Sequence, residues 1–122
     1  SPEQKKVYEI VLQAQLKSLE VLKSGVSCKE ADAAARDIIK NAGYGEYFGH
    51  GTGHGVGVEI HELPNLSPRS EHTLKVGNVV TVEPGIYLPN KFGVRIEDMA
   101  VITAQGYENL TKAPKELIIL DI

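Results

Sequence analysis

The 122-residue chain has one cysteine, no tryptophan and no strong excess of charge of either sign. A single thiol, Cys28, cannot form an internal disulfide, so nothing indicates an oxidising compartment. The formal net charge of −3 offers no electrostatic footprint for nucleic acid or for an anionic membrane. Every apolar run falls short of the roughly 18 residues that span a bilayer. We therefore expect one modest hydrophobic core in a soluble, cytoplasmic domain that binds neither nucleic acid nor membrane.

Helical patterns dominate the first third of the chain. Apolar residues recur at helical spacing through residues 1–25, which predicts a first helix. A second helix is predicted over residues 27–42, where Ser27 and Glu30 form the S-x-x-E pattern of a capping box. Gly43 is the expected stop.

After the second helix, residues 48–122 are mainly β in pattern. Apolar and polar residues alternate over residues 56–61, and the runs NVVTVEPGIY, GVRIEDMAVIT and ELIIL indicate further strands. Turns are expected around Pro89 and at Gly106. Two helices followed by antiparallel-type strands predict the α+β class, with the whole chain in a single domain.

Two carboxylates lie within these apolar runs. Glu83 ends VVTVE and Glu97 lies in VRIED, and an ionised carboxylate in such surroundings is costly unless it is paired or bound to a metal. Strand alternation puts Arg95 on the same face as Glu97, so a purely structural ion pair is an open alternative. Asp98 falls on the opposite face, where we expect an edge or solvent-exposed residue.

Three of the four histidines, His50, His54 and His61, lie in HGTGHGVGVEIHE, residues 50–62, among four glycines. Two carboxylates on adjacent strands and a histidine from a glycine-rich loop form a ligand set that suits Mn²⁺, Co²⁺ or Zn²⁺, with manganese favoured by the carboxylates. The glycines would let the chain turn sharply and leave room for a substrate. His72, in a polar loop, is expected to be solvated.

HGTGHGVGVEIHE, VEPGIY and VRIED resemble, in order and spacing, three motifs of the pita-bread metallopeptidases. This family includes Xaa-Pro aminopeptidase, Xaa-Pro dipeptidase (prolidase) and methionine aminopeptidase. Methionine aminopeptidases typically lack a histidine that corresponds to His50, and their last ligand usually lies in a different context from the R-I-E-D around Glu97. The resemblance is therefore stronger to the proline-specific branch. The resemblance implies the α+β pita-bread fold, two divalent metal ions with Mn²⁺ first, and a homo-oligomer in the full enzyme. It also implies a peptide substrate with proline in second position, and it does not separate aminopeptidase from dipeptidase.

The resemblance implies three metal ligands in this chain: His54, Glu83 and Glu97. Glu83 would also act as the general base, and Glu97 would bridge two metal ions. His50 and His61 resemble the substrate-facing histidines of the family. Tyr87 and Arg95 match positions of a hydrogen-bond and proton-transfer network around the metals.

One departure from the family concerns two further ligands. The complete family site has two aspartates on a hairpin before the first helix, and Asp32 and Asp37 lie in the second helix, where they do not fit that role. We therefore expect residues 1–122 to be the C-terminal half of a catalytic domain that alone is metal-poor and inactive. The alternatives are a non-catalytic pita-bread binding module, a methionine aminopeptidase-like enzyme, and a mononuclear or unrelated hydrolase.

Overall fold

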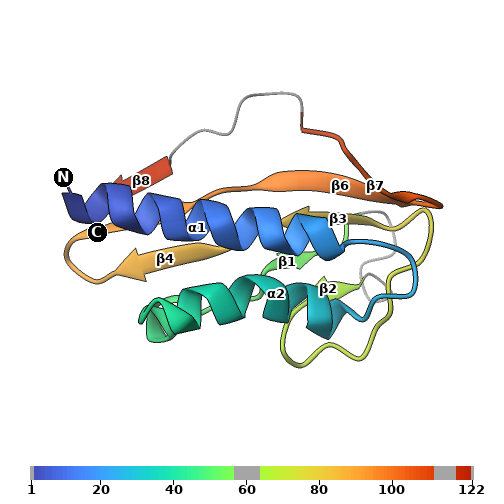
Figure 1. The fold of residues 1–122 in the computed structure, drawn as a ribbon, viewed down its shortest axis with the longest axis horizontal. Coiled ribbons are helices and arrows are strands. Elements are labelled where there is room, and N and C mark those ends of the chain that lie inside the picture. The colour runs from blue at the N-terminus through green and yellow to red at the C-terminus, as the bar shows by residue number, and fades with distance from the viewer. Residues whose placement is uncertain (1, 57–63, 112–117, 122) are drawn as a thin grey trace.

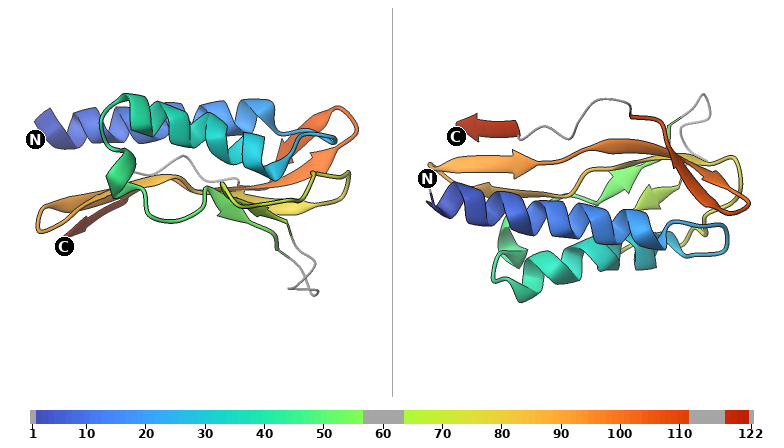
Figure 2. Two further views of the ribbon diagram at one scale, coloured as in Figure 1. Left: turned by 90° about the horizontal axis from the view of Figure 1, so that it is seen from below. Right: turned by 45° about the horizontal axis from the view of Figure 1, so that its top comes forward.

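The computed structural model describes residues 2–56 and 64–111, and the backbone of residues 118–121. Two helices lie along one side of a layer of short strands, as Figure 1 and the left view of Figure 2 show. The helical elements are α1 (Pro2–Val21), α2 (Cys28–Asn41) and the short 3₁₀ helix η1 (Gly45–Tyr47). The strands are β1 (Gly53–His54), β2 (Asn65–Leu66), β3 (Val79–Val82), β4 (Gly85–Leu88), β5 (Phe92–Arg95), β6 (Asp98–Thr103), β7 (Gly106–Asn109) and β8 (Ile118–Asp121). All described strand pairs are antiparallel, so the predicted α+β order is confirmed.

The first helix is shorter than predicted. It ends at Val21 rather than near residue 25, because Leu22 is drawn into the core and closes a tight turn by donating its N–H to the Leu19 carbonyl at 3.1 Å. The glycine expected to end the helix, Gly25, has a φ of 94° and belongs to the connecting turn. Neither helix in the described part of the chain is long and apolar enough to cross a membrane.

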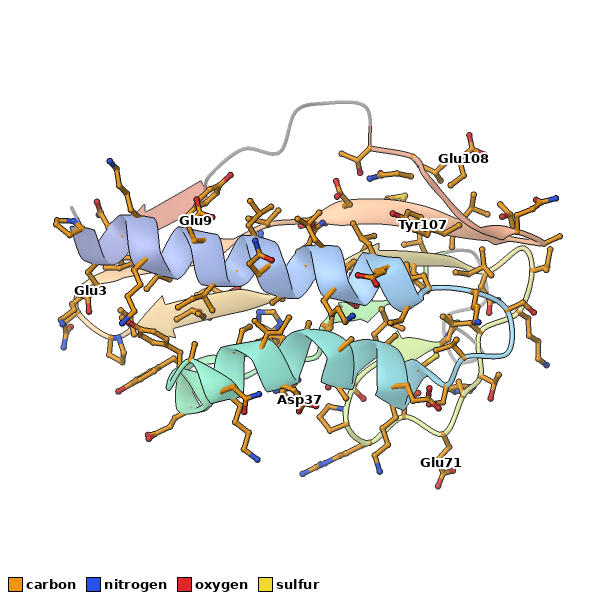
Figure 3. The ribbon with its side chains drawn as sticks, in the orientation of Figure 1. Glu3, Glu9, Asp37, Glu71, Tyr107 and Glu108 are labelled. Carbon is orange, nitrogen blue, oxygen red and sulfur yellow. The ribbon has the colours of Figure 1, made fainter. Side chains whose placement is uncertain are left out.

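The second helix begins and ends as predicted. Ser27 is its N-cap, and its hydroxyl oxygen accepts a hydrogen bond from the Glu30 N–H at 3.0 Å. Gly43 follows the last turn with a φ of 94°, a conformation that costs glycine little. The acidic residues on the outer faces of the helices, including Glu9 and Asp37, are exposed, as Figure 3 shows.

Within the described residues the strands form three small sheets, ordered β1-β2, β3-β6-β7 and β4-β5-β8. The β-rich run NVVTVEPGIY and the run GVRIEDMAVIT, which was predicted as one strand, each contain two strands that belong to different sheets. NVVTVEPGIY is divided into β3 and β4 by Glu83 and Pro84, and GVRIEDMAVIT is divided into β5 and β6 by Ile96 and Glu97. Pro84 and Gly85 mark the first break in the sequence, whereas the second break has no glycine or proline.

The two breaks lie side by side. Val82 pairs with Asp98 on one side of them and Gly85 pairs with Arg95 on the other. The Ile96 N–H also donates to the Pro84 carbonyl at 3.4 Å. Because the register is the same on both sides, the positions of Glu83 and Glu97 lie opposite one another.

Two apolar clusters join the helices to the strands. One, beneath the first half of α1, contains Val7, Val11, Ala14, Ala35, Ile39, Phe48, Ile86, Leu88, Phe92, Val94 and Ile96. The other contains Leu19, Leu22, Cys28, Ala31, Leu66, Leu74, Val80, Val82, Ala100 and Ile102. The clusters flank the two breaks, which fixes both glutamates to a packed framework.

Asp98 was expected at an edge or in solvent, and that prediction is wrong. Its side chain is buried, with 2% of its surface exposed, and it accepts a hydrogen bond from Gln15 Nε2 at 2.6 Å. Gln15 is itself buried on α1. Strand alternation correctly separates Asp98 from Glu97, but the opposite face is covered by a helix that offers a polar partner.

Candidate metal centre

His54 and Glu83 face one another at the end of β1. The His54 Nε2 atom lies 3.8 Å from Glu83 Oε2. The His54 Nδ1 atom is 3.0 Å from the Gly55 carbonyl oxygen, which can only accept, so Nδ1 carries the proton. In the neutral ring the Nε2 lone pair is therefore free for a metal ion, with the orientation set by the backbone carbonyl, as is usual for ligating histidines. The imidazole is 57% exposed, which leaves it accessible.

Two hydrogen bonds hold the backbone around these side chains. The His54 N–H donates to the Thr81 hydroxyl at 3.0 Å, and the Glu83 N–H donates to the Thr52 carbonyl at 2.6 Å. The segments that carry the histidine and the glutamate are therefore hydrogen-bonded to each other directly beside the site.

Glu97 lies opposite Glu83 across the paired strand breaks. Carboxylates at opposed positions of neighbouring strands repel one another unless a cation lies between them or beside them. Arg95 supplies such a cation, with its Nε atom 3.8 Å from Glu97 Oε1. This is the ion pair that the sequence left open as an alternative, and with side chains 37% and 43% exposed it contributes little to stability.

His50 is oriented by three neighbours. Its Nδ1 atom is 2.7 Å from the Gly51 carbonyl oxygen and its Nε2 atom is 2.8 Å from the Tyr87 hydroxyl. Phe48 packs edge-on against the ring, with centroids 5.1 Å apart. Since Nδ1 must donate to the carbonyl, the neutral ring accepts from the Tyr87 O–H at Nε2.

Burial raises the pKa of the Tyr87 hydroxyl, and the adjacent Arg95 guanidinium opposes that shift. The hydroxyl is therefore protonated at neutral pH and available as a donor to His50. Gly85 makes room for it, because a Cβ there would lie 2.6 Å from the Tyr87 oxygen. The resemblance implied one network for Tyr87 and Arg95, and in the structure Tyr87 lies beside His50 while Arg95 lies near both Glu97 and the Tyr87 hydroxyl.

Gly51 and Gly53 allow the loop to pack closely against neighbouring backbone. A Cβ at Gly53 would lie 1.7 Å from the Thr81 carbonyl oxygen, and one at Gly51 would lie 2.8 Å from the Leu66 carbonyl oxygen. We expected these glycines to provide clearance for substrate. At Gly51 and Gly53 the clearance is instead for neighbouring backbone.

A cavity of about 280 Å³ opens beside this loop. It is lined by His50, Gly51, Gly53, His54, Asn65, Ser67 and Glu83. Asn65 and Ser67 were not among the predicted site residues, because the proline-marked loop that carries them has no periodic pattern. They reach the cavity because β2 pairs with β1.

The described residues show only part of the predicted site. Among the described residues, no three His, Cys, Asp or Glu side chains are grouped closely enough to hold a metal ion. His61 and the strand expected over residues 56–61 fall largely outside the described residues. His72 is exposed in its loop, as predicted.

An α+β fold with opposed glutamates and a neighbouring histidine is the arrangement expected of a metallopeptidase. Residues 1–104 match the family model "Metallopeptidase family M24". The chain belongs to this family, and its resemblance to the pita-bread metallopeptidases is confirmed. Membership in a metallopeptidase family implies metal ions, without specifying which.

Several proteins similar to this chain are named for a particular peptidase activity. The Xaa-Pro dipeptidase of Pyrococcus horikoshii is 55% identical over 115 residues, which are 94% of this chain and 33% of that protein. A solved Xaa-Pro dipeptidase from Bacillus anthracis is 56% identical with a TM-score of 0.90, covering 97% of this chain and 33% of that one. The X-Pro aminopeptidase of Thermotoga maritima is 50% identical with a TM-score of 0.89, covering 95% and 33%. The fold is confirmed, and the chain spans about a third of the length of these relatives.

Proposed function

We propose that this chain forms part of the active site of a metal-dependent peptidase that hydrolyses the Xaa-Pro bond at the N-terminus of a peptide. The observation that carries the proposal is the register that sets Glu83 opposite Glu97 at paired strand breaks, with His54 Nε2 3.8 Å from Glu83. Opposed carboxylates beside a free imidazole nitrogen are costly for folding alone and suited to a divalent cation.

His54, Glu83 and Glu97 would hold the metal. Their nitrogen and oxygen donors fit Mn²⁺, with Co²⁺ or Zn²⁺ as alternatives. Metal ions bound there would supply Lewis acidity toward a scissile carbonyl. With three protein ligands, this chain alone is expected to bind metal weakly and to be inactive without the rest of a complete ligand set.

The side chains around the metal ligands would accept and donate protons during hydrolysis. Glu83 accepts a proton from the attacking water as general base. His50 has its Nδ1 proton committed to the Gly51 carbonyl, so it can donate to substrate only from Nε2. In the neutral ring that nitrogen accepts a hydrogen bond from the Tyr87 hydroxyl at 2.8 Å, so His50 would donate from it only when the imidazole carries both protons. Arg95 holds the tyrosine hydroxyl, and His61 is proposed as a second substrate-facing group.

The substrate proposed is a peptide with proline in second position. Similar proteins bear the names of both dipeptidases and an aminopeptidase, so both peptide lengths belong in the test. A cytoplasmic location and a homo-oligomeric full enzyme are part of the same proposal.

A chimera tests the function directly. Residues 1–122 would replace the matching third of the Pyrococcus horikoshii Xaa-Pro dipeptidase. With Mn²⁺ the chimera should hydrolyse Ala-Pro or Ala-Pro-Ala but not Ala-Ala, and Glu97→Gln should remove turnover while the matched exposed variant Glu108→Gln retains it. A folded chimera that binds Mn²⁺ and cleaves none of these peptides would overturn the proposal and favour a non-catalytic binding module. Equal cleavage of Ala-Ala would overturn the proline specificity.

A further inference from the structure

Helix α2 carries a buried ion pair that the proposed chemistry does not use. Asp32 is only 1% exposed and accepts two hydrogen bonds from Arg36, one helical turn later: from Nε at 2.8 Å and from a terminal nitrogen at 3.0 Å. In the described part of the chain, the other hydrogen bonds of these two side chains go to the loop of residues 48–52. We call Asp32 and Arg36 the α2 clamp.

Arg36 holds the loop before and at His50. One terminal nitrogen donates to the Phe48 carbonyl at 3.2 Å and the other to the His50 carbonyl at 2.9 Å. The guanidinium carbon also lies 4.3 Å from the centre of the Phe48 ring, within the range of a cation–π contact. Phe48 in turn packs against the His50 ring, so the arginine holds the His50 backbone and the ring that supports its side chain.

Asp32 holds the loop after His50. One of its oxygens accepts from the Thr52 N–H at 3.0 Å and from the Thr52 hydroxyl at 2.8 Å. The Thr52 carbonyl in turn accepts from the Glu83 N–H at 2.6 Å. A short hydrogen-bonded path therefore runs from α2 through Thr52 to Glu83.

We propose that Asp32 and Arg36 are positioning residues that fix where His50 and Glu83 lie relative to each other. His50 lies between Gly49 and Gly51, so the backbone that carries it has little intrinsic rigidity. The clamp fixes that backbone on both sides of the histidine while touching neither the histidine ring nor a carboxylate of the site. A buried ion pair adds little net stability compared with apolar packing, so its consequence here is geometric. The inference rests on the proposed function.

The first test uses the 122-residue chain and needs no activity. Long-range ¹H–¹⁵N spectra report the tautomer of each imidazole, with His72 as an internal control. In the native sequence His50 should show one fixed tautomer protonated at Nδ1. Arg36→Lys, which keeps the charge but loses the planar fork, should give an averaged His50 signal at unchanged far-UV circular dichroism. The exposed neighbour variant Lys29→Gln should leave His50 unchanged.

The second test uses kinetics in the chimera. Arg36→Lys should lower kcat by about tenfold or more with little change in KM, since small misplacements of reacting groups act mainly on the chemical step. If Arg36→Lys does not fold, Thr52→Val removes only the hydroxyl contact with Asp32 and Thr52→Ser should restore it, so this pair gives the same comparison.

The outcomes separate the two proposals. A fixed His50 tautomer and a native kcat in folded Arg36→Lys or Thr52→Val would overturn the clamp and leave the proposed function intact. An inactive native chimera whose His50 tautomer still depends on Arg36 would overturn the function and leave the positioning of the histidine standing.

Discussion

Replacing Gly53 by alanine should destabilise the backbone around the site more than a glycine-to-alanine change at any other position of the loop. The added Cβ would lie 1.7 Å from the Thr81 carbonyl oxygen and 2.7 Å from the Thr81 carbonyl carbon. Both are backbone atoms, so no side-chain rotation relieves the overlap. β1 must move away from β3 by more than about 1 Å to restore ordinary contact.

That movement breaks a defined set of hydrogen bonds. The bonds at risk are His54 N–H to Thr81 Oγ1 at 3.0 Å, Glu83 N–H to the Thr52 carbonyl at 2.6 Å, and Val56 N–H to the Val79 carbonyl at 2.9 Å. At about 1 kcal/mol net for each bond, the free energy of unfolding should fall by roughly 3 kcal/mol. For a small domain with a urea m-value of about 1–3 kcal/mol/M, the midpoint should fall by about 1–3 M.

Urea unfolding of the 122-residue chain, followed by far-UV circular dichroism, measures this shift. Gly49→Ala is the matched control, because a Cβ at Gly49 would meet nothing within 4 Å. Its free energy of unfolding should stay within about 0.5 kcal/mol of the native value. Equal midpoints for Gly53→Ala and Gly49→Ala would refute the close approach of β1 to β3.

Three further predictions concern single side chains. Cys28 is fully buried and burial raises its thiol pKa, so iodoacetamide at pH 8 should leave it unmodified in the folded chain and alkylate it in urea; native labelling at the rate of a free thiol would contradict this. Because burial also raises the Tyr87 pKa, this tyrosine should ionise last as pH rises. Tyr87→Phe should therefore remove the highest-pH step from the ultraviolet titration of the five tyrosines. Loss of an earlier step would contradict this prediction. Asp98→Ala should lower the free energy of unfolding by about 2–4 kcal/mol in urea melts because Gln15 loses its carboxylate partner, whereas the exposed control Glu108→Ala should change it little; equal effects would contradict the burial of Asp98.

Features with a local cause could be predicted from the sequence. The start and end of α2 follow from Ser27, Glu30 and Gly43, each of which acts within one turn of the chain. The motif glutamates could also be singled out, since a carboxylate in an apolar run needs a partner wherever the run folds.

Features that depend on distant partners could not be predicted. The burial of Asp98 requires Gln15, which lies 83 residues away in the sequence. The strand break at Ile96 and Glu97 has no glycine or proline to mark it, because the change of sheet there is set by how the strands pack rather than by local turn residues. Asp32 has the spacing of an ordinary surface pair with Arg36, and only the return of the loop over α2 makes it a buried clamp.

The central claim is that His54, Glu83 and Glu97 belong to one divalent-metal centre, and paramagnetic broadening by Mn²⁺ tests it most directly. Substoichiometric Mn²⁺ added to the ¹⁵N-labelled 122-residue chain should broaden the amide signals of these three residues first and leave those of the exposed His72 and Glu108 sharp. His54→Ala should abolish that selectivity. Broadening centred on exposed carboxylates, or equal broadening at His72, would contradict the account.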